Sequence, residues 1–290
     1  MNLLGRAFTE MSVAWLLLSA TLGGVIGAAL NSLFEEVINP RIRDRRSLRQ
    51  VVHKLTMPLI RSADSLRGRI LNLLAGIRHE GFKIQDDDQY RLSTLYLFAQ
   101  FLAWVRILEQ EVFFLDFENS RRSRRFNIRL NSVFKGFTSV FYFQEKGESP
   151  PKIPTVYRTV LSAIGESAIV TGADGKLSVV GFAEFVSRVE TNPEIRRWLA
   201  YLEDFLTDLR SEAEDTRWDR LVIISAQLDL LLWSLDPTRQ RTRERKIDVH
   251  YMLHPLAIRN FRQEIERSGY PTNGVRWPDD IEGGHLDEGP

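Results

Sequence analysis

The sequence predicts a mainly α-helical protein: an amino-terminal transmembrane helix, then a helical domain with one small β-hairpin. Three observations support this fold class. No charged residue occurs in the 24 positions from Met11 to Phe34. Apolar residues recur at helical spacing through most of the chain beyond residue 40. Only one region, around Asp174-Gly175, has the composition of a hairpin. We expect three parts: an anchor over 1–34, a helical domain over 40–265, and a disordered acidic tail over 266–290.

The anchor is centred on "SVAWLLLSATLGGVIGAAL", residues 12–30. A bilayer core about 30 Å thick requires about 20 helical residues, and the uncharged stretch meets that length. A cleaved signal peptide is the alternative, but its apolar core is usually about 7 to 15 residues long. The arginine-rich segment that follows also resists translocation. A membrane-spanning helix is therefore predicted.

Basic residues predict the orientation of this helix. Arg6 is the only basic side chain before the span, whereas many follow it. The positive-inside bias places the carboxyl side in the cytoplasm and the amino terminus outside, in a single-pass inner-membrane topology. Arginines beside the span can also contact anionic lipid head groups, each contributing about 1 kcal/mol. The expected lipid-contacting residues are Arg41, Arg43, Arg45, Arg46 and Arg49.

Small residues within the span predict helix–helix packing in the membrane. They form two ridges at i, i+4, i+8 spacing: Ser19, Gly23 and Gly27, and Ala20, Gly24 and Ala28. Such ridges let two helix backbones approach closely. The alternative is that Gly and Ala are simply common in membrane helices. The pattern predicts a homo-oligomer, with an unknown protein partner as the other expectation.

Helical periodicity and prolines divide the first part of the domain. Pro40 suits the first position of a helix, and Pro58 is expected to end that helix and begin the next. An apolar stripe from Ala63 to Ile77 defines the second helix. Gly81 and the "QDDDQ" run at 85–89 predict a loop.

Residues 90–117 are the richest helix candidate. The uncharged core from Leu92 to Val105 has 14 residues, which is too short to cross a bilayer, so we expect a helix buried on most sides. The basic run "RRSRR" at 121–125 is expected to be a solvated loop. Phe134 and Phe137 then indicate another helix.

The second half of the domain contains the hairpin and two strong helices. β-Branched residues flanking Asp174-Gly175 predict a hairpin near 168–180. Asn192 as N-cap and Pro193 at the first position open a helix, and a last helix covers 217–235. The expected core face of the helix after Pro193 consists of Ile195, Trp198, Leu199, Leu202, Phe205, Leu206 and Leu209.

Three segments resemble metal-binding motifs, but none has the ligand types and spacing that a metal site requires. His250 and His254 are four residues apart, but no third ligand accompanies them. A calcium loop built on Asp174-Gly175 would need carboxylates at Val170 and Gly181. Adjacent acids at 86–88 are typical of a solvated loop. We expect no metal and no cofactor.

Catalytic patterns are also weak. Glu109 and Glu111 lie two positions apart and do not share a helical face, whereas Arg106 and Glu109 suit an ion pair. Neither a glycine-rich phosphate loop nor a nucleophile elbow occurs. With 0 cysteines, thiol nucleophiles and disulfides are excluded. No catalytic residue is expected, and the sequence favours a protein without enzymatic activity.

Charge gives little indication of nucleic acid as a partner. The formal net charge is +1, so the chain has no strong positive field overall. The run at 121–125 has no interleaved aromatic residues for base stacking. No nucleic-acid partner is expected.

Three stretches, "PLIRSADSLRGRILNLL", "YRLSTLYLFAQFLAWVRILEQEVFFLDF" and "SAIGESAIV", resemble segments of uncharacterised bacterial single-pass membrane-anchored helical proteins. The resemblance covers about a fifth of the chain. It implies that the central helices are a recurring unit, and it transfers no functional residue.

These observations together predict a single-pass inner-membrane protein whose cytoplasmic helical domain binds a partner or assembles with itself. Two alternatives remain open. The first is a membrane-linked effector or sensor that acts through clustering of the span. The second is an enzyme whose site is built from dispersed residues.

Overall fold

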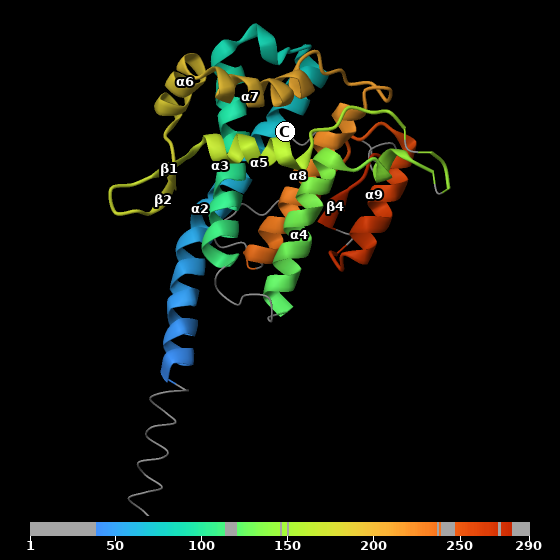
Figure 1. Cartoon of the computed structure of the whole chain (residues 1–290). Coiled ribbons are helices and arrows are strands. Elements are labelled where there is room, and N and C mark those ends of the chain that lie inside the picture. The colour runs from blue at the N-terminus through green and yellow to red at the C-terminus, as the bar shows by residue number, and fades with distance from the viewer. Residues whose placement is uncertain are drawn as a thin grey trace, which may run out of the picture. The chain divides into compact units, whose positions relative to one another are not determined.

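The computed structural model describes the backbone of residues 39–113, 121–145, 147–149, 151–236, 238, 247–271 and 274–279. Side chains are described from Leu55 onward within these ranges, except at 112, 113 and 121–123. The chain divides into two compact units, Met1–His53 and Lys54–Pro290. The described part of the second unit is mainly helical (Figure 1).

The first described helix, α2, runs without a break from Asn39 to Glu80 and contains Pro58. The predicted break at this proline is therefore wrong. An internal proline costs about 3 kcal/mol, but Leu55, Leu59 and Ala63 keep helical spacing across it, so an unbroken helix holds them on one face. The residues buried after Pro58 are Leu59, Ile60, Ala63, Leu66, Ile70, Leu73 and Leu74. At about 1.5–3 kcal/mol for each large apolar side chain, their burial outweighs the cost of the proline.

The helix predicted over 90–117 is α3, Asp88–Phe113. A short 3-10 turn, η2 (Ile84–Asp86), precedes it, and Asp87 accepts a hydrogen bond from the Tyr90 backbone N–H at 2.8 Å. The acidic run thus begins a helix instead of forming an open loop. By length and composition Asp88–Glu111 could cross a membrane, the one such helix in the described ranges, but 56% of its apolar window is buried inside the protein. That burial agrees with the predicted core helix.

Helix α5, Arg158–Ser167, packs across α3. The contact is close at Gly165, where an added Cβ would lie 2.8 Å from the Leu102 carbonyl carbon and oxygen. A side chain at this position would push against the α3 backbone itself. Glycine at 165 therefore sets the separation of the two helices.

Helices α4 (Arg121–Thr138) and α8 (Thr216–Leu235) pack side by side (Figure 1). All residues of α8 from Trp218 to Leu232 are buried, as expected for a helix enclosed on every side. The "RRSRR" run forms the first turn of α4, so the loop predicted at 121–125 is wrong.

The predicted hairpin is confirmed. Strands β1 (Ile169–Thr171) and β2 (Leu177–Val179) pair antiparallel, with Val170 opposite Ser178. Gly175 has φ +75°, the left-handed conformation that a tight turn requires of its glycine. The hairpin leads into α6, Phe182–Thr191.

Helix α7, Pro193–Leu206, begins at the predicted cap. The Asn192 side-chain oxygen accepts a hydrogen bond from the Glu194 N–H at 2.9 Å. This bond satisfies one of the free donors in the first turn. The N-cap prediction is confirmed.

The carboxyl-terminal part differs from the predicted disordered tail over 266–290. Strands β3 (Ile247–Asp248) and β4 (Val275–Arg276) pair parallel, with α9 (Pro255–Arg267) between them. Val275 and Trp277 are buried, and Arg262 lies 4.6 Å from the Trp277 ring centroid. Two apolar side chains in a polar sequence thus attach this segment to the core. Folded structure extends to residue 279, and residues 280–290 lie outside the described ranges.

A buried ion pair connects two helices that lie far apart in the sequence. Arg67 on α2 is 1% exposed and Asp229 on α8 is 2% exposed, and the Arg67 guanidinium donates to the Asp229 carboxylate. Its other terminal nitrogen donates to Asp64 at 2.7 Å. Such pairing is needed because an uncompensated buried charge costs several kcal/mol.

Candidate protein-binding surface

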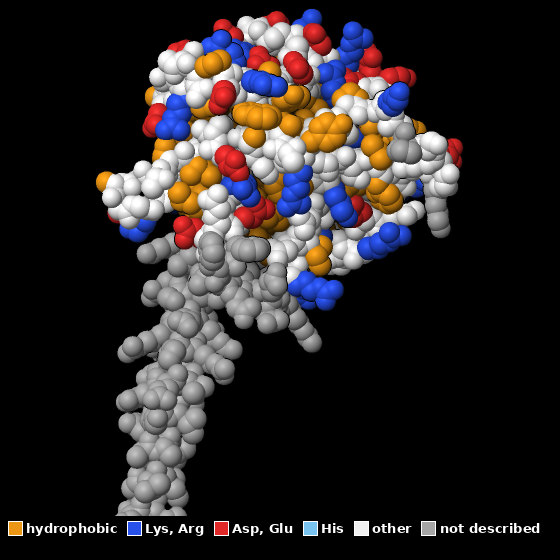
Figure 2. All heavy atoms as spheres, viewed as in Figure 1, with side chains coloured by type: hydrophobic (Ala, Val, Ile, Leu, Met, Phe, Trp, Pro, Cys, Tyr) orange, Lys and Arg blue, Asp and Glu red, His pale blue; other side chains and the backbone are white. Residues whose placement is uncertain are grey.

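Two exposed aromatic side chains on α7, Trp198 and Tyr201, form what we call the α7 aromatic face, and a third, Tyr157, lies at the start of α5. Trp198 is 37% exposed, Tyr201 47% and Tyr157 68%. The Trp198 and Tyr201 rings stack with centroids 6.4 Å apart and an interplanar angle of 26°. Tyr157 is the N-cap residue of α5, which packs against α7. Figure 2 shows hydrophobic side chains gathered over these two helices.

Trp198 was predicted to face the core, and its exposure corrects that expectation. The buried residues of α7 are Leu199, Leu202, Phe205 and Leu206. Trp198 lies on the same side of the helix as these residues, but part of its side chain is left uncovered. The signal that could have identified the face is the pair Trp198 and Tyr201, which are three residues apart and therefore neighbours on one side of the helix.

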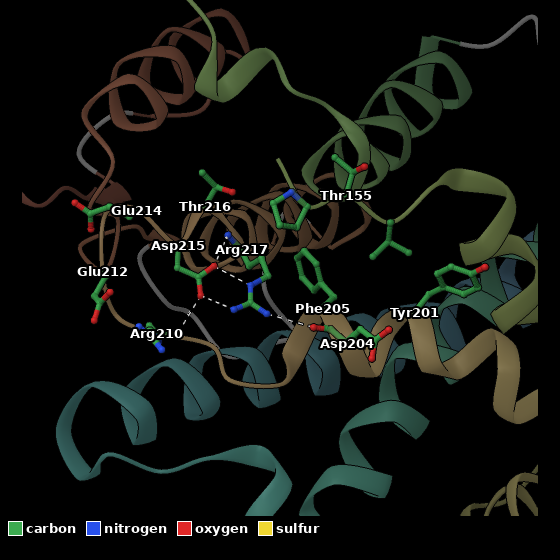
Figure 3. Close-up of a pocket in the computed structure, with 12 residues that line it drawn as sticks. Thr155, Tyr201, Asp204, Phe205, Arg210, Glu212, Glu214, Asp215, Thr216 and Arg217 are labelled. Carbon is green, nitrogen blue, oxygen red and sulfur yellow. Dashed lines mark hydrogen bonds and ion pairs between the residues drawn. The ribbon is translucent and has the colours of Figure 1, made fainter. Parts of the chain in front are cut away.

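An open depression of about 540 Å³ adjoins Tyr201. Its walls come from the end of α7, the loop to α8, the first turn of α8, and the segment before α5 (Figure 3). The lining residues are Pro154, Thr155, Val156, Tyr201, Asp204, Phe205, Arg210, Glu212, Glu214, Asp215, Thr216 and Arg217. The shape suits one or two side chains of another protein better than an enclosed small molecule.

Arg217 holds the loop wall in place. Its guanidinium donates to the backbone carbonyls of Thr207 at 2.8 Å and Asp208 at 3.1 Å, and to the Asp215 carboxylate at 2.7 Å. Asp215 is also the N-cap of α8 and accepts from the Arg210 N–H at 3.1 Å. With these bonds formed, Arg217 and Asp215 are occupied in shaping the wall.

The remaining charges of the depression are mostly negative. The side chains of Asp204, Glu212 and Glu214 belong to exposed residues, and Arg210 is the exposed cation among the lining residues. Figure 3 shows Glu212 and Glu214 projecting from the loop and Asp204 from α7. Figure 3 shows Asp204 on the same side of the depression as Tyr201, so a cationic side chain entering there would meet a carboxylate and an aromatic ring, which also attracts cations.

A second open depression of about 640 Å³ lies along α2 and α3 and includes Arg67, Arg69 and Tyr90 among its lining residues. Its cations already have partners. Arg67 is paired as described above, and the Arg69 guanidinium lies 4.2 Å from the Tyr90 ring centroid. This depression is therefore a weaker candidate for binding.

Two acids elsewhere, the buried Asp219 and the half-buried Glu264, serve as hydrogen-bond acceptors. The Asp219 carboxylate accepts from the Leu253 N–H at 2.8 Å and the His254 N–H at 3.2 Å. Burial raises the pKa of Asp219 to about 6, although both bonds favour the charged form. Glu264 accepts from the Tyr142 hydroxyl at 2.8 Å. Neither acid lines the two depressions.

His250 and His254 make separate contacts in the structure. His250 lies in a turn and pairs with Asp248. His254 is the N-cap residue of α9, with its ring edge-on to Phe143 at 5.4 Å. Within the described residues, no group of three or more His, Cys, Asp or Glu side chains is arranged to hold a metal ion. The predicted ion pair between Arg106 and Glu109 is present at 2.9 Å.

The predicted membrane-packing residues, Ser19, Ala20, Gly23, Gly24, Gly27 and Ala28, lie outside the described residues. The predicted lipid-contacting arginines, Arg41, Arg43, Arg45, Arg46 and Arg49, belong to the first turns of α2, with side chains outside the described set.

No protein-family model, curated protein or solved structure matches this chain.

Proposed function

We propose that this chain is a single-pass inner-membrane protein whose cytoplasmic domain binds a protein partner through the α7 aromatic face and its adjoining depression. The observation that carries the proposal is the exposure of stacked Trp198 and Tyr201 beside a rigid depression lined by carboxylates. The span at 12–30 would hold this surface at the membrane. No enzymatic activity is part of the proposal.

The side chains of this face are those that dominate protein interfaces. Trp and Tyr are enriched at binding hot spots, because they bury large areas while ordering few torsions. Here Trp198, Tyr201 and Tyr157 leave such area open to solvent. A partner that covers the rings and places a Lys or Arg side chain in the depression would use both features.

Membrane attachment explains how a small contact surface can be sufficient. Two proteins held in one bilayer meet at a high effective concentration, so weak contacts between their domains become effective. Pairing of the spans through Gly23 and Gly27 would supply the same advantage to two copies of this chain. Self-assembly and a distinct partner both remain compatible with the proposal.

The test is site-specific photo-crosslinking of the full-length protein in its native cells. A photoreactive residue replaces Arg197, which is exposed and adjacent to Trp198. We expect a crosslinked product of one discrete mass, which is lost in the Trp198→Ala, Tyr201→Ala double variant. Twice the mass of the chain would identify a second copy, and another mass a distinct protein.

Phe141→Ala provides the matched control, because Phe141 is 50% exposed and lies in the 3-10 turn η4 (Phe141–Phe143), outside this surface. The control should leave the crosslink unchanged. A product from position 197 that survives the double variant would contradict the proposal. So would a yield no higher than that from a photoreactive residue at Lys135, an exposed position on α4.

A further inference from the structure

The first turns of α4 carry an unusual density of positive charge. The segment "RRSRRFNIR", residues 121–129, contains five arginines and no acid. Arg124 and Arg125 are exposed. Because these residues form a helix and not the predicted loop, their positions relative to one another are fixed. Arg124 and Arg125 therefore form a defined basic surface.

The charges are placed where the helix itself disfavours them. The amino-terminal end of a helix is the positive end of its dipole, where acidic side chains are stabilising and basic ones are not. The first turn of α4 contains no acidic residue. The charge of Arg125 also contributes to lowering the pKa of Arg129, after the larger effect of burial. An anionic surface against this end would relieve both repulsions.

An exposed apolar side chain lies among these arginines. Ile128 is 52% exposed, and it follows Arg124 by four residues and Arg125 by three, so all three share one side of the helix. Lys135 extends that side and is exposed. A basic helix face with an apolar residue is typical of binding at a membrane surface, where the cations meet phosphates and the apolar group enters the interface.

We propose that Arg124, Arg125 and Ile128, the α4 basic face, dock the domain on anionic phospholipid head groups. The inference rests on the membrane anchoring of the proposed function. Figure 1 shows that α2 beyond residue 54 and α4 run in the same direction. Phe126, the aromatic residue in the run, packs against the core, so no ring is free to stack on a nucleic-acid base.

The test uses the full chain reconstituted in vesicles of phosphatidylcholine alone or mixed with phosphatidylglycerol. The sequence has 0 cysteines, so Asn127→Cys gives a single fluorophore at an exposed position between Arg124 and Ile128. Lipids with a nitroxide head group report proximity by quenching. We expect strong quenching only with phosphatidylglycerol, and its loss at high salt, because screening shortens electrostatic range.

Charge reversal sets the size of the expected effect. Arg124→Glu with Arg125→Glu should lower the ratio of docked to undocked domain at least about 30-fold, which is the loss expected from removing two arginine charges before the repulsion of the two new carboxylates is added. Arg197→Glu with Lys152→Glu reverses two exposed cations elsewhere and should leave quenching unchanged. A fluorophore at Gln89→Cys, at the exposed start of α3, should remain unquenched in both vesicles.

Failure of the anchor and failure of the docking face give different results. If an alkaline wash removes the chain from both kinds of vesicle, the membrane anchoring of the proposed function is wrong. The docking inference is then wrong as well, because it rests on that anchoring. If the chain stays in the vesicles but the fluorophore at 127 is quenched equally with and without phosphatidylglycerol, only the docking inference is overturned. Unchanged quenching after the reversal of Arg124 and Arg125 would overturn it as well.

Discussion

Replacing Asp219 by asparagine should make the stability of the domain less dependent on pH. The Asp219 side chain is fully buried, and burial raises its pKa from 3.8 to about 6. A folded-state pKa above the unfolded value means that the native state holds the proton more tightly. The stabilisation is therefore fully present below about pH 4 and is lost as pH rises through about 6. Ionisation at neutral pH costs about 3 kcal/mol, at 1.36 kcal/mol per pKa unit.

Asparagine keeps an oxygen that can accept the N–H groups of Leu253 and His254 but carries no charge. Its amide also adds donors in a buried position, which shifts the free energy of unfolding by an amount independent of pH. That offset cancels in the difference between pH 4 and pH 7. Relative to the native protein, Asp219→Asn should therefore gain about 2 kcal/mol over this range, because the carboxyl of the unfolded chain is already partly ionised at pH 4.

Denaturant unfolding of the detergent-solubilised full chain measures this difference. Tryptophan fluorescence is a suitable signal, because Trp218 adjoins the site and its indole N–H donates to the Tyr251 carbonyl at 2.6 Å. The His254 pKa is lowered by burial, so stability from that group changes with pH in the opposite direction, and it does so in both proteins. A difference between the two proteins that stays constant from pH 4 to pH 7 would refute the reasoning.

Two further predictions concern close packing. Gly165→Ala should destabilise the domain by about 2 kcal/mol or more, because the new Cβ would lie 2.8 Å from the α3 backbone; thermal unfolding measures this. Gly68→Ala, with no atom within 4 Å, is the control and should be neutral or stabilising by up to about 1 kcal/mol. Gly23→Leu with Gly27→Leu should abolish pairing of the spans, measured by crosslinking in membranes, whereas Val25→Leu on the other side should not. Unchanged pairing in the double variant would exclude the predicted ridge.

Local signals in the sequence predicted the elements with short-range causes. The α7 cap depends on Asn192 and Pro193, which act within one helical turn. The hairpin depends on Asp174-Gly175, a turn that few other residue pairs favour. Both were recognisable because the cause and the structure occupy the same few residues.

Elements decided by distant contacts were predicted less well. Pro58 signalled a break, but burial of residues on both sides keeps α2 continuous. The composition after residue 266 predicted disorder, but Val275 and Trp277 are buried in the core, and β4 pairs with a strand whose partner residues lie 28 positions earlier in the chain. Neither outcome follows from local propensity, because the deciding free energy comes from other parts of the chain.

The candidate surface was missed for a related reason. Periodicity separates the sides of a helix, but it does not show how much of an apolar side another element covers. Trp198 fits the core pattern of α7 but is partly exposed in the structure, and Tyr201 lies outside that pattern. The arginines at 121–125 were recognised as a motif. The structure shows that Arg124 and Arg125 belong to a helix and share one side of it with Ile128, which the sequence interpretation as a solvated loop did not include.

The ion pair between Arg67 and Asp229 imposes an order on biosynthesis. The two residues are 162 positions apart, and a span near the amino terminus would enter the membrane long before the ribosome reaches Asp229. Until then Arg67 has to remain hydrated, because sealing it into an apolar interior without its carboxylate is costly. The domain must therefore complete its folding late, and α2 stays in contact with water until Asp229 has been synthesised. A chaperone that protects nascent chains would meet the apolar side of α2 during this interval.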